Sequence, residues 1–163
     1  MAIIILEVGN YEMISCESGV SGERLKRVAD LWLDANLEAH SFIDQHYWLS
    51  NYEPVKRQLA QATLFVATQS KTIVGFLGIT NNYIAGLFVD KRVRRQGVGR
   101  QLLDAVKAGR SELTLSVYEK NQAAYHFYNM QGFYKEAITI DEATGESVFE
   151  MKWQRSSGKG SIR

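Results

Sequence analysis

The spacing of apolar positions along the chain changes several times, and each change marks a new element of secondary structure. Short alternating or continuous apolar runs predict strands, and apolar residues that repeat every three or four positions predict helices. The strands expected on this basis cover residues 3–6, 13–16, 63–69, 73–80, 83–89, 113–117, 133–140 and 147–153. The expected helices cover residues 21–35, 47–61, 99–108 and 121–131.

Glycine, proline and asparagine set the boundaries between these elements. Asn121 is expected to cap the helix that follows it, and Gly109 and Gly132 are expected to end the helices that precede them. Pro54, the only proline, lies inside the second helical pattern and predicts a break near Glu53, because proline restricts the residue before it. Tight turns are expected at residues 70–72 and 81–82.

The order of these elements indicates a mixed α/β (α+β) fold. The run 83–89 is nearly all apolar, which is typical of a strand buried on both faces. A helix separates it from the strand 113–117, and such a crossover makes a pair of strands parallel, whereas short turns make the other pairs antiparallel. We expect one domain over residues 1–153, followed by a flexible tail of Ser, Gly and basic residues over 154–163.

Composition narrows the class of protein. The chain has 163 residues, a formal net charge of +1 and 45% apolar residues, which are ordinary values for a single globular domain. No apolar run approaches the roughly 20 residues of a membrane span, and no charge excess points to nucleic acid or to a membrane surface. Cys16 is the only cysteine, so no intramolecular disulfide can form. We expect a cytoplasmic protein, either a monomer or a homodimer.

The stretch from Val89 to Arg100 carries the first candidate chemistry. Gly97 and Gly99 let the backbone approach a ligand closely, and the helix that starts there directs free N–H groups toward it. Fixed positive charge surrounds this helix start, at Arg92, Arg94, Arg95 and Arg100. Such a loop favours a phosphate or a pyrophosphate, although a basic, solvated turn would have the same composition.

Three phosphate-binding patterns can be compared with this loop. A nucleotide P-loop needs Gly-x-x-x-x-Gly-Lys-Ser/Thr, which is absent from the sequence. A dinucleotide fingerprint needs a third glycine where the chain has Leu102. The pattern Arg/Gln-x-x-Gly-x-Gly/Ala matches residues 94–99 in full.

A second pattern follows over residues 115–133. It consists of a strand, an asparagine, a short helix ending in Phe-Tyr, and Gly-Phe at the start of the next strand. Asn121, Tyr125 and Tyr128 share one face of that helix. An aromatic face packed in the core is the simpler explanation, and it suits Phe127.

With both patterns in this order, the chain resembles the GCN5-related N-acetyltransferase (GNAT) superfamily, as a small bacterial single-domain member, over roughly Val20 to Trp153. The resemblance implies a mixed, mainly antiparallel sheet flanked by about four helices, with a splayed parallel strand pair at the cofactor slot. It implies acetyl-CoA as the co-substrate and no metal. The residues that it places at coenzyme A are Leu87, Phe88, Val89, Arg94, Arg95, Gln96, Gly97, Val98, Gly99, Arg100, Asn121 and Tyr128.

The resemblance also implies a mechanism, in which an amine attacks the thioester directly in a ternary complex. Tyr128 matches the family's general acid, which protonates the leaving thiolate. A thiol of pKa about 8.5 and a phenol of pKa about 10 are close enough for such a transfer. A backbone N–H near Val89 is the expected oxyanion donor.

The general base and the acceptor are less defined. Some relatives carry a glutamate where this chain has Ser116, which is not a base. His40 is the favoured candidate for the base, and water relays are an alternative. His40, Phe42 and Tyr47 are expected to bind the acceptor, since they resemble a segment found in a subgroup of small bacterial members. The other candidate bases are Glu38, Asp44, His46 and Glu119.

The acceptor is expected to be a small amine, an amino acid or a protein lysine. A protein of another class is also conceivable, namely a non-catalytic acyl-CoA-binding module that regulates a partner. Loss of Tyr128 or of the loop glycines would have favoured that module, and all of them are present. A nucleic-acid-binding role lacks a second basic stripe.

Overall fold

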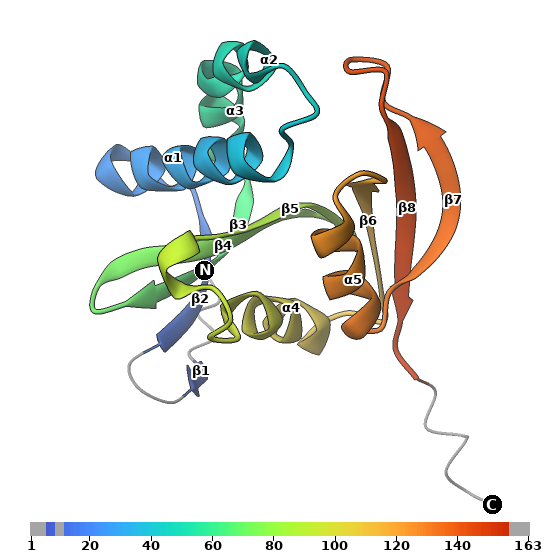
Figure 1. Cartoon of the computed structure of the whole chain (residues 1–163). Coiled ribbons are helices and arrows are strands. Elements are labelled where there is room, and N and C mark those ends of the chain that lie inside the picture. Colours follow the sequence, from blue (N-terminus) through green and yellow to red (C-terminus); the bar gives the residue numbers. More distant parts are fainter. Residues whose placement is uncertain (1–5, 9–11, 157–163) are drawn as a thin grey trace, which may run out of the picture.

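The computed structural model describes residues 6–8 and 12–156, and the element labels follow Figure 1. The elements, in chain order, are β1 (Leu6–Val8), β2 (Glu12–Ser18), α1 (Gly22–Ala39), α2 (Gln45–Ser50), α3 (Tyr52–Leu59), β3 (Thr63–Gln69), β4 (Thr72–Thr80), β5 (Tyr83–Val89), the 3₁₀ turn η1 (Lys91–Val93), α4 (Val98–Ala108), β6 (Glu112–Tyr118), α5 (Gln122–Met130), β7 (Tyr134–Ile140) and β8 (Ser147–Gln154). The described strands form one sheet in the order β1-β2-β3-β4-β5-β6-β8-β7.

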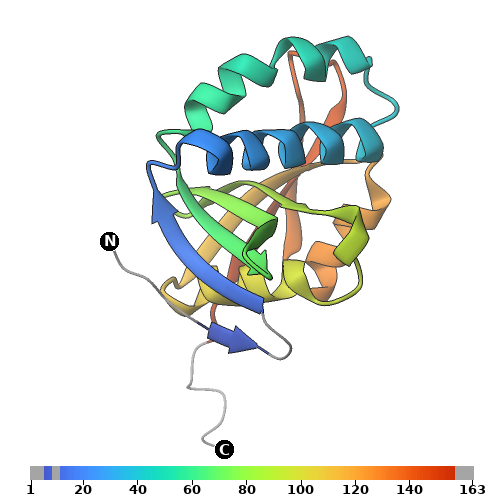
Figure 2. The same cartoon turned by 90° about the vertical axis from the view of Figure 1, so that its left-hand side faces the viewer.

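Helices cover both faces of this sheet. Figures 1 and 2 show α1, α2 and α3 on one side and α4 on the other, with α5 beside β6. The central strand β3 explains this arrangement, because its residues alternate between two apolar cores. Leu64 and Val66 pack with α1, whereas Phe65 and Ala67 pack with α4. Burial of apolar side chains on both faces is the main force that holds the three layers together.

The sheet splits between β5 and β6. These strands run parallel, as predicted, but they pair only at Tyr83–Thr114 and Ile84–Leu115. The register between β4 and β5 shifts at this point, which leaves Ala85 as an extra residue in β5. Beyond Ile84 the strands diverge, so the β6-facing N–H and C=O groups of β5 have no ladder partner among the described strands. The mixed, mainly antiparallel sheet with a splayed parallel pair is therefore confirmed.

Two predictions about individual elements were wrong. The helix expected over 47–61 is two helices, and the break lies at Asn51 instead of near Glu53. Pro54 falls in the first turn of α3, where a missing backbone N–H costs no intrahelical bond. The strand β5 is not buried on both faces: only Ile84 is fully buried, because the splay leaves one side of the strand open.

The chain ends needed smaller corrections. Of the strand expected over 3–6, only Leu6 lies among the described residues, at the start of β1. The last strand runs to Gln154, one residue into the expected tail. Arg155 is also held in place, because its backbone N–H donates to the Ser111 carbonyl at 2.7 Å. The residues 157–163 lie outside the described part of the chain. None of the described helices is long and apolar enough to cross a membrane.

Candidate active site

A cavity of about 530 Å³ opens where β5 and β6 diverge. Its walls come from elements that are distant in sequence: the C-terminal half of α1, Trp48 of α2, both splayed strands, α5, and the β7–β8 hairpin. The side chains that carry chemistry in this wall are His40, Tyr83, Ser116, Tyr118, Asn121, Tyr128, Asp141, Glu142 and Glu150. Leu87 and Phe88 of the predicted cofactor strand line the same cavity, whereas Val89 borders a separate cleft between α1 and η1.

The glycine loop lies at the N-terminus of α4, as the sequence indicated. Gly97 has φ +82° and serves as the N-cap, a left-handed conformation that favours glycine. Gly99 lies against α5, since an added Cβ would stand 3.2 Å from the Phe127 ring. Val98 is buried and anchors the turn. The first backbone N–H groups of α4 are consequently free to bind an anion.

The basic side chains of this loop do not all point to one place. Arg94 forms a two-pronged ion pair with Glu38 at 2.5 and 2.8 Å, which ties the loop to the last turn of α1. Arg95, at φ +65°, and Arg100 are exposed. Gln96 is also exposed and accepts a hydrogen bond from Gln69. Arg95 and Arg100 are thus the loop arginines available to a phosphate.

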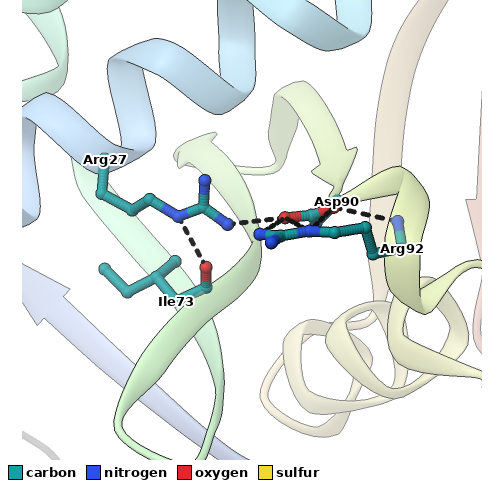
Figure 3. A network of polar contacts seen from close by, with 4 residues as sticks. All are labelled: Arg27, Ile73, Asp90 and Arg92. Carbon is teal, nitrogen blue, oxygen red and sulfur yellow. Dashed lines mark hydrogen bonds and ion pairs between the residues drawn. The ribbon is translucent and has the colours of Figure 1, made fainter.

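Asp90 fixes the turn that leads into this loop (Figure 3). Its carboxylate accepts from Arg27 of α1 at 2.7 Å, and from both the backbone and the side chain of Arg92. Arg27 also donates to the Ile73 carbonyl of β4. The side-chain hydrogen bond from Arg92 is the main cause that holds the pKa of Asp90 well below its usual value. This network joins α1, β4 and η1.

Helix α5 presents Asn121 and Tyr128 to the cavity. Asn121 caps the helix, because its Oδ1 accepts from the Ala124 N–H at 3.2 Å. Tyr128 is buried, yet its hydroxyl has no hydrogen-bond partner within the described part of the chain. Burial raises the pKa of this phenol above its ordinary value, so Tyr128 stays protonated at neutral pH. Tyr125 faces Phe149 in the core instead of the cavity.

His40 lies at the cavity wall, but its geometry argues against a role as general base. Since Oδ1 of Asn121 is used in the cap, its Nδ2 faces His40 and donates to Nε2 at 3.0 Å. The proton of the neutral ring is therefore on Nδ1, which is buried without a partner among the described residues. Burial also lowers the pKa of His40 to about 4. A ring whose lone pair is occupied and whose basicity is this low is a poor proton acceptor.

The other predicted acceptor residues support the wall without lining it. Phe42 packs edge-on against His40 and Tyr118, and Tyr47 packs edge-on against Trp48. The remaining base candidates also lie elsewhere. Glu38 is paired with Arg94, Asp44 caps α2 by accepting from the His46 N–H, and neither His46 nor Glu119 borders the cavity.

A row of polar side chains along the sheet, which no sequence motif indicated, also borders the cavity. Tyr83 donates to Ser116 at 3.1 Å, and Ser116 donates to Glu150 at 2.6 Å. Thr139 donates to the other oxygen of Glu150 at 3.1 Å. These residues come from β5, β6, β8 and β7, and no local motif links them. The described residues contain no cluster of three or more side chains suited to a metal ion.

Comparisons with known proteins identify the family of this chain. A family model described as an acetyltransferase (GNAT) domain matches residues 36–155. The peptidyl-lysine N-acetyltransferase YiaC of Escherichia coli (strain K12) is 31% identical over 131 residues, which cover 79% of this chain and 90% of that protein.

Two solved structures share the fold. The solution structure of apo YjaB from Escherichia coli has a TM-score of 0.76 and 26% identity, over 86% of this chain and 97% of that one. A GNAT acetyltransferase from Elizabethkingia anophelis with acetyl-CoA bound has a TM-score of 0.66 and 16% identity, over 91% of this chain and 100% of that one.

Proposed function

The chain belongs to the GNAT acetyltransferase family and uses acetyl-CoA, and we propose that it transfers the acetyl group to the side-chain amine of a lysine in a peptide or protein. The single observation that carries this proposal is the cavity at the splayed strands, which is lined both by the protonated Tyr128 and by the unpaired edge of β5. Support for the acceptor comes from the relative YiaC, which is named a peptidyl-lysine N-acetyltransferase.

The co-substrate fits two features of the structure, the N-terminus of α4 and the unpaired edge of β5. Pyrophosphate would lie at the N-terminus of α4, on the amides that follow Gly97, with Arg95 and Arg100 nearby. The pantetheine arm would run along the free edge of β5 toward Leu87 and Phe88. The amides of that edge can replace the missing strand pairing with hydrogen bonds to the arm.

At the end of the arm, the acetyl carbonyl would meet the residues that act on it. A β5 N–H on the open edge would hold the oxygen as negative charge develops there. Tyr128 would donate its hydroxyl proton to the sulfur as the carbon–sulfur bond breaks. Because burial raises the pKa of Tyr128, the phenol carries its proton when the substrates bind and is able to donate it.

The acceptor would approach a second part of the cavity wall. The residues of this part are the aromatic group His40, Trp48 and Tyr118 and the carboxylates Asp141 and Glu142 of the β7–β8 hairpin. Aromatic rings suit the aliphatic stem of a lysine, and carboxylates at the rim attract its charge. His40 contributes to this wall as a structural residue, because it accepts a hydrogen bond from Asn121.

The test is acetyl-CoA turnover with a pool of lysine-containing peptides, read by mass spectrometry of the products. The expected product is a peptide acetylated on a lysine side chain. The same pool with blocked lysines is the control. Acetylation confined to peptide N-termini or to free small amines would contradict the lysine acceptor, while leaving the acetyltransferase activity in place.

A further inference from the structure

Glu150 is the one acidic side chain of the cavity that is both positioned by neighbouring strands and available to a ligand. It lies on β8, directly across from Ser116 of β6 in the antiparallel register. One oxygen accepts from Ser116 at 2.6 Å and the other from Thr139 at 3.1 Å. A carboxylate has about four lone-pair positions, so two remain open for further donors.

The other two carboxylates of the cavity differ from Glu150. Asp141 accepts from the Tyr118 hydroxyl at 2.6 Å with one oxygen and from the Ala143 N–H at 3.0 Å with the other, so it shapes the β7–β8 turn. Glu142 is exposed at the tip of that hairpin, and no hydrogen bond fixes it to the described residues. Of these three carboxylates, only Glu150 accepts hydrogen bonds from both neighbouring strands, β6 and β7.

The row Tyr83–Ser116–Glu150 runs from β5 across β6 to β8, next to the two positions at which β5 and β6 still pair. Tyr83 lies where β5 and β6 still pair, and its hydroxyl reaches Ser116 at 3.1 Å. Tyr83 donates to Ser116 and Ser116 donates to Glu150, so the hydroxyls of this row stabilise the negative charge of Glu150 at the cavity wall. Tyr128 lines the same cavity.

From this arrangement, we propose that Glu150 is a catalytic residue that binds the acceptor ammonium and accepts one of its protons. The inference rests on the proposed acetyl transfer. The nitrogen attacks the acetyl carbon, so a carbon–nitrogen bond forms, and the carbon–sulfur bond breaks with its electron pair on sulfur. Before the attack, the ammonium releases one proton to water, which frees the nitrogen lone pair. After the attack, Glu150 takes the second proton from the nitrogen, and sulfur takes its proton from Tyr128.

The open side of the cavity completes the cycle. Ser116 and Thr139 are exposed, so solvent reaches the carboxyl of Glu150 and can remove its proton after transfer. The phenolate of Tyr128 recovers the first proton through water that enters by the same route. The nitrogen becomes much more acidic once it is bonded to the acetyl carbon, which is why a carboxylate is a sufficient acceptor at that stage.

The experiment compares Glu150→Gln with the parent protein, using a lysine peptide and acetyl-CoA. Glutamine keeps the size and one accepting oxygen, and its NH2 can donate to the second hydroxyl, but the charge is removed. A hydrogen bond to a charged group contributes roughly 1.5–3 kcal/mol, so kcat/KM for the peptide should fall about 10- to 100-fold. The Kd for acetyl-CoA, measured by calorimetry, should stay within about twofold.

Two further variants separate catalysis from a merely structural role. Glu150→Asp keeps the charge one methylene further back, and it should be clearly more active than Glu150→Gln. Glu136→Gln removes a carboxylate from the exposed strand β7, outside the cavity, and should behave as the parent does.

A Glu150→Gln variant with the parent kcat/KM would overturn the proposal. So would equal losses in the Gln and Asp variants together with a lower melting temperature, because that pattern belongs to a cross-strand packing pair. Failure of the proposed function is distinguishable from both, since it appears in the parent protein as acetyl-CoA binding without lysine acetylation.

Discussion

At the residue scale, the hydroxyl of Tyr128 is the group whose removal is most informative. It is buried at the cavity and has no partner among the described residues, so it is available to a ligand. Tyr128→Phe removes only this donor. General acid catalysis contributes about 10²–10⁴-fold, so the single-turnover rate with a lysine peptide should fall by that range while the acetyl-CoA affinity changes little.

Tyr125→Phe is the matched control for that variant. It lies one helical turn earlier on α5, and its ring packs against Phe149 at a centroid distance of 5.0 Å. Its rate should stay within about threefold of the parent, since its hydroxyl does not border the cavity. Equal rates for Tyr128→Phe and the parent would show that Tyr128 is only a packing residue.

His40 gives a prediction about pH. Burial lowers its pKa from 6.5 to about 4, so between these values the unfolded chain binds a proton that the folded chain does not. Stability should therefore fall as the pH drops from 6.5 toward 4, by roughly 2 kcal/mol at most because the ring is partly exposed. Urea unfolding at pH 7.5 and pH 5 measures the loss.

The control for this titration is His40→Gln, which can keep a hydrogen bond to Asn121 but does not titrate. The parent should lose more stability than this variant over the same pH interval. Other groups titrate in both proteins, so the difference between them isolates the ring. If the two proteins lose equal stability, the pKa of His40 is not lowered in the folded protein.

What the sequence revealed about single residues depended on their place in a motif. Asn121 and Tyr128 stand in a local pattern on one helix, and the structure places both at the cavity. Glu150 has no such signal, because it is one polar position in an ordinary alternating strand, and its hydrogen-bond partners lie 34 and 11 residues away. His40 was found, but its fixed hydrogen bond to Asn121 depends on tertiary contact.

At the element scale, the start of α4 is the feature most open to test. Gly97→Glu places a negative side chain at φ +82°, beside the free N–H groups of the helix. Repulsion of the pyrophosphate should raise the Kd for acetyl-CoA roughly tenfold or more. Calorimetry on a variant with a native circular dichroism spectrum measures this change.

Gly97→Ala controls for the backbone. An alanine there has the same left-handed strain, about 1–2 kcal/mol, without the charge. Its melting temperature should fall as much as that of Gly97→Glu, whereas its Kd should rise much less. If the two variants bind acetyl-CoA equally well, the phosphates do not lie against this turn.

The element boundaries show where local signals are sufficient. Gly109, Gly132 and Asn121 all flank helices where the sequence placed them, because caps and glycine stops act within one turn. The break between α2 and α3 was misplaced, since Pro54 is tolerated in a first turn and the residue that ends α2 is Asn51. The exposure of β5 was not predicted, because apolar residues in a strand can line a ligand site as well as pack in a core.

At the scale of the whole molecule, the helix crossover alone predicted the parallel pair, and the resemblance to known acetyltransferases predicted its splay. The divergence after Ile84 coincides with the extra residue Ala85 in β5, and the cavity that it opens is walled by α5 and the β7–β8 hairpin. This arrangement involves residues far apart in sequence, which periodicity cannot describe. The cavity is the direct result of this divergence, so its lining could be predicted only where a motif named it.

The hydrogen-bond network at Asp90 connects α1 to β4 and η1, so its loss should lower the stability of the whole fold. Asp90→Asn removes the charge that pairs with Arg27 and Arg92 (Figure 3), and breaking a largely buried pair costs about 2–4 kcal/mol, or roughly 5–10 °C in melting temperature at this chain length. The pKa of Asp90 is lowered, so its contribution is present above the unfolded pKa near 4 and is lost as the pH falls below it. The difference in stability between parent and variant should therefore be constant from pH 5 to 8 and shrink below about pH 4.

The control is Asp34→Asn. Asp34 is an exposed residue of α1 that borders the same cleft between α1 and η1 as Asp90, and its replacement should change the melting temperature by less than about 2 °C. An Asp90→Asn variant as stable as Asp34→Asn would mean that apolar packing alone joins α1 to the sheet.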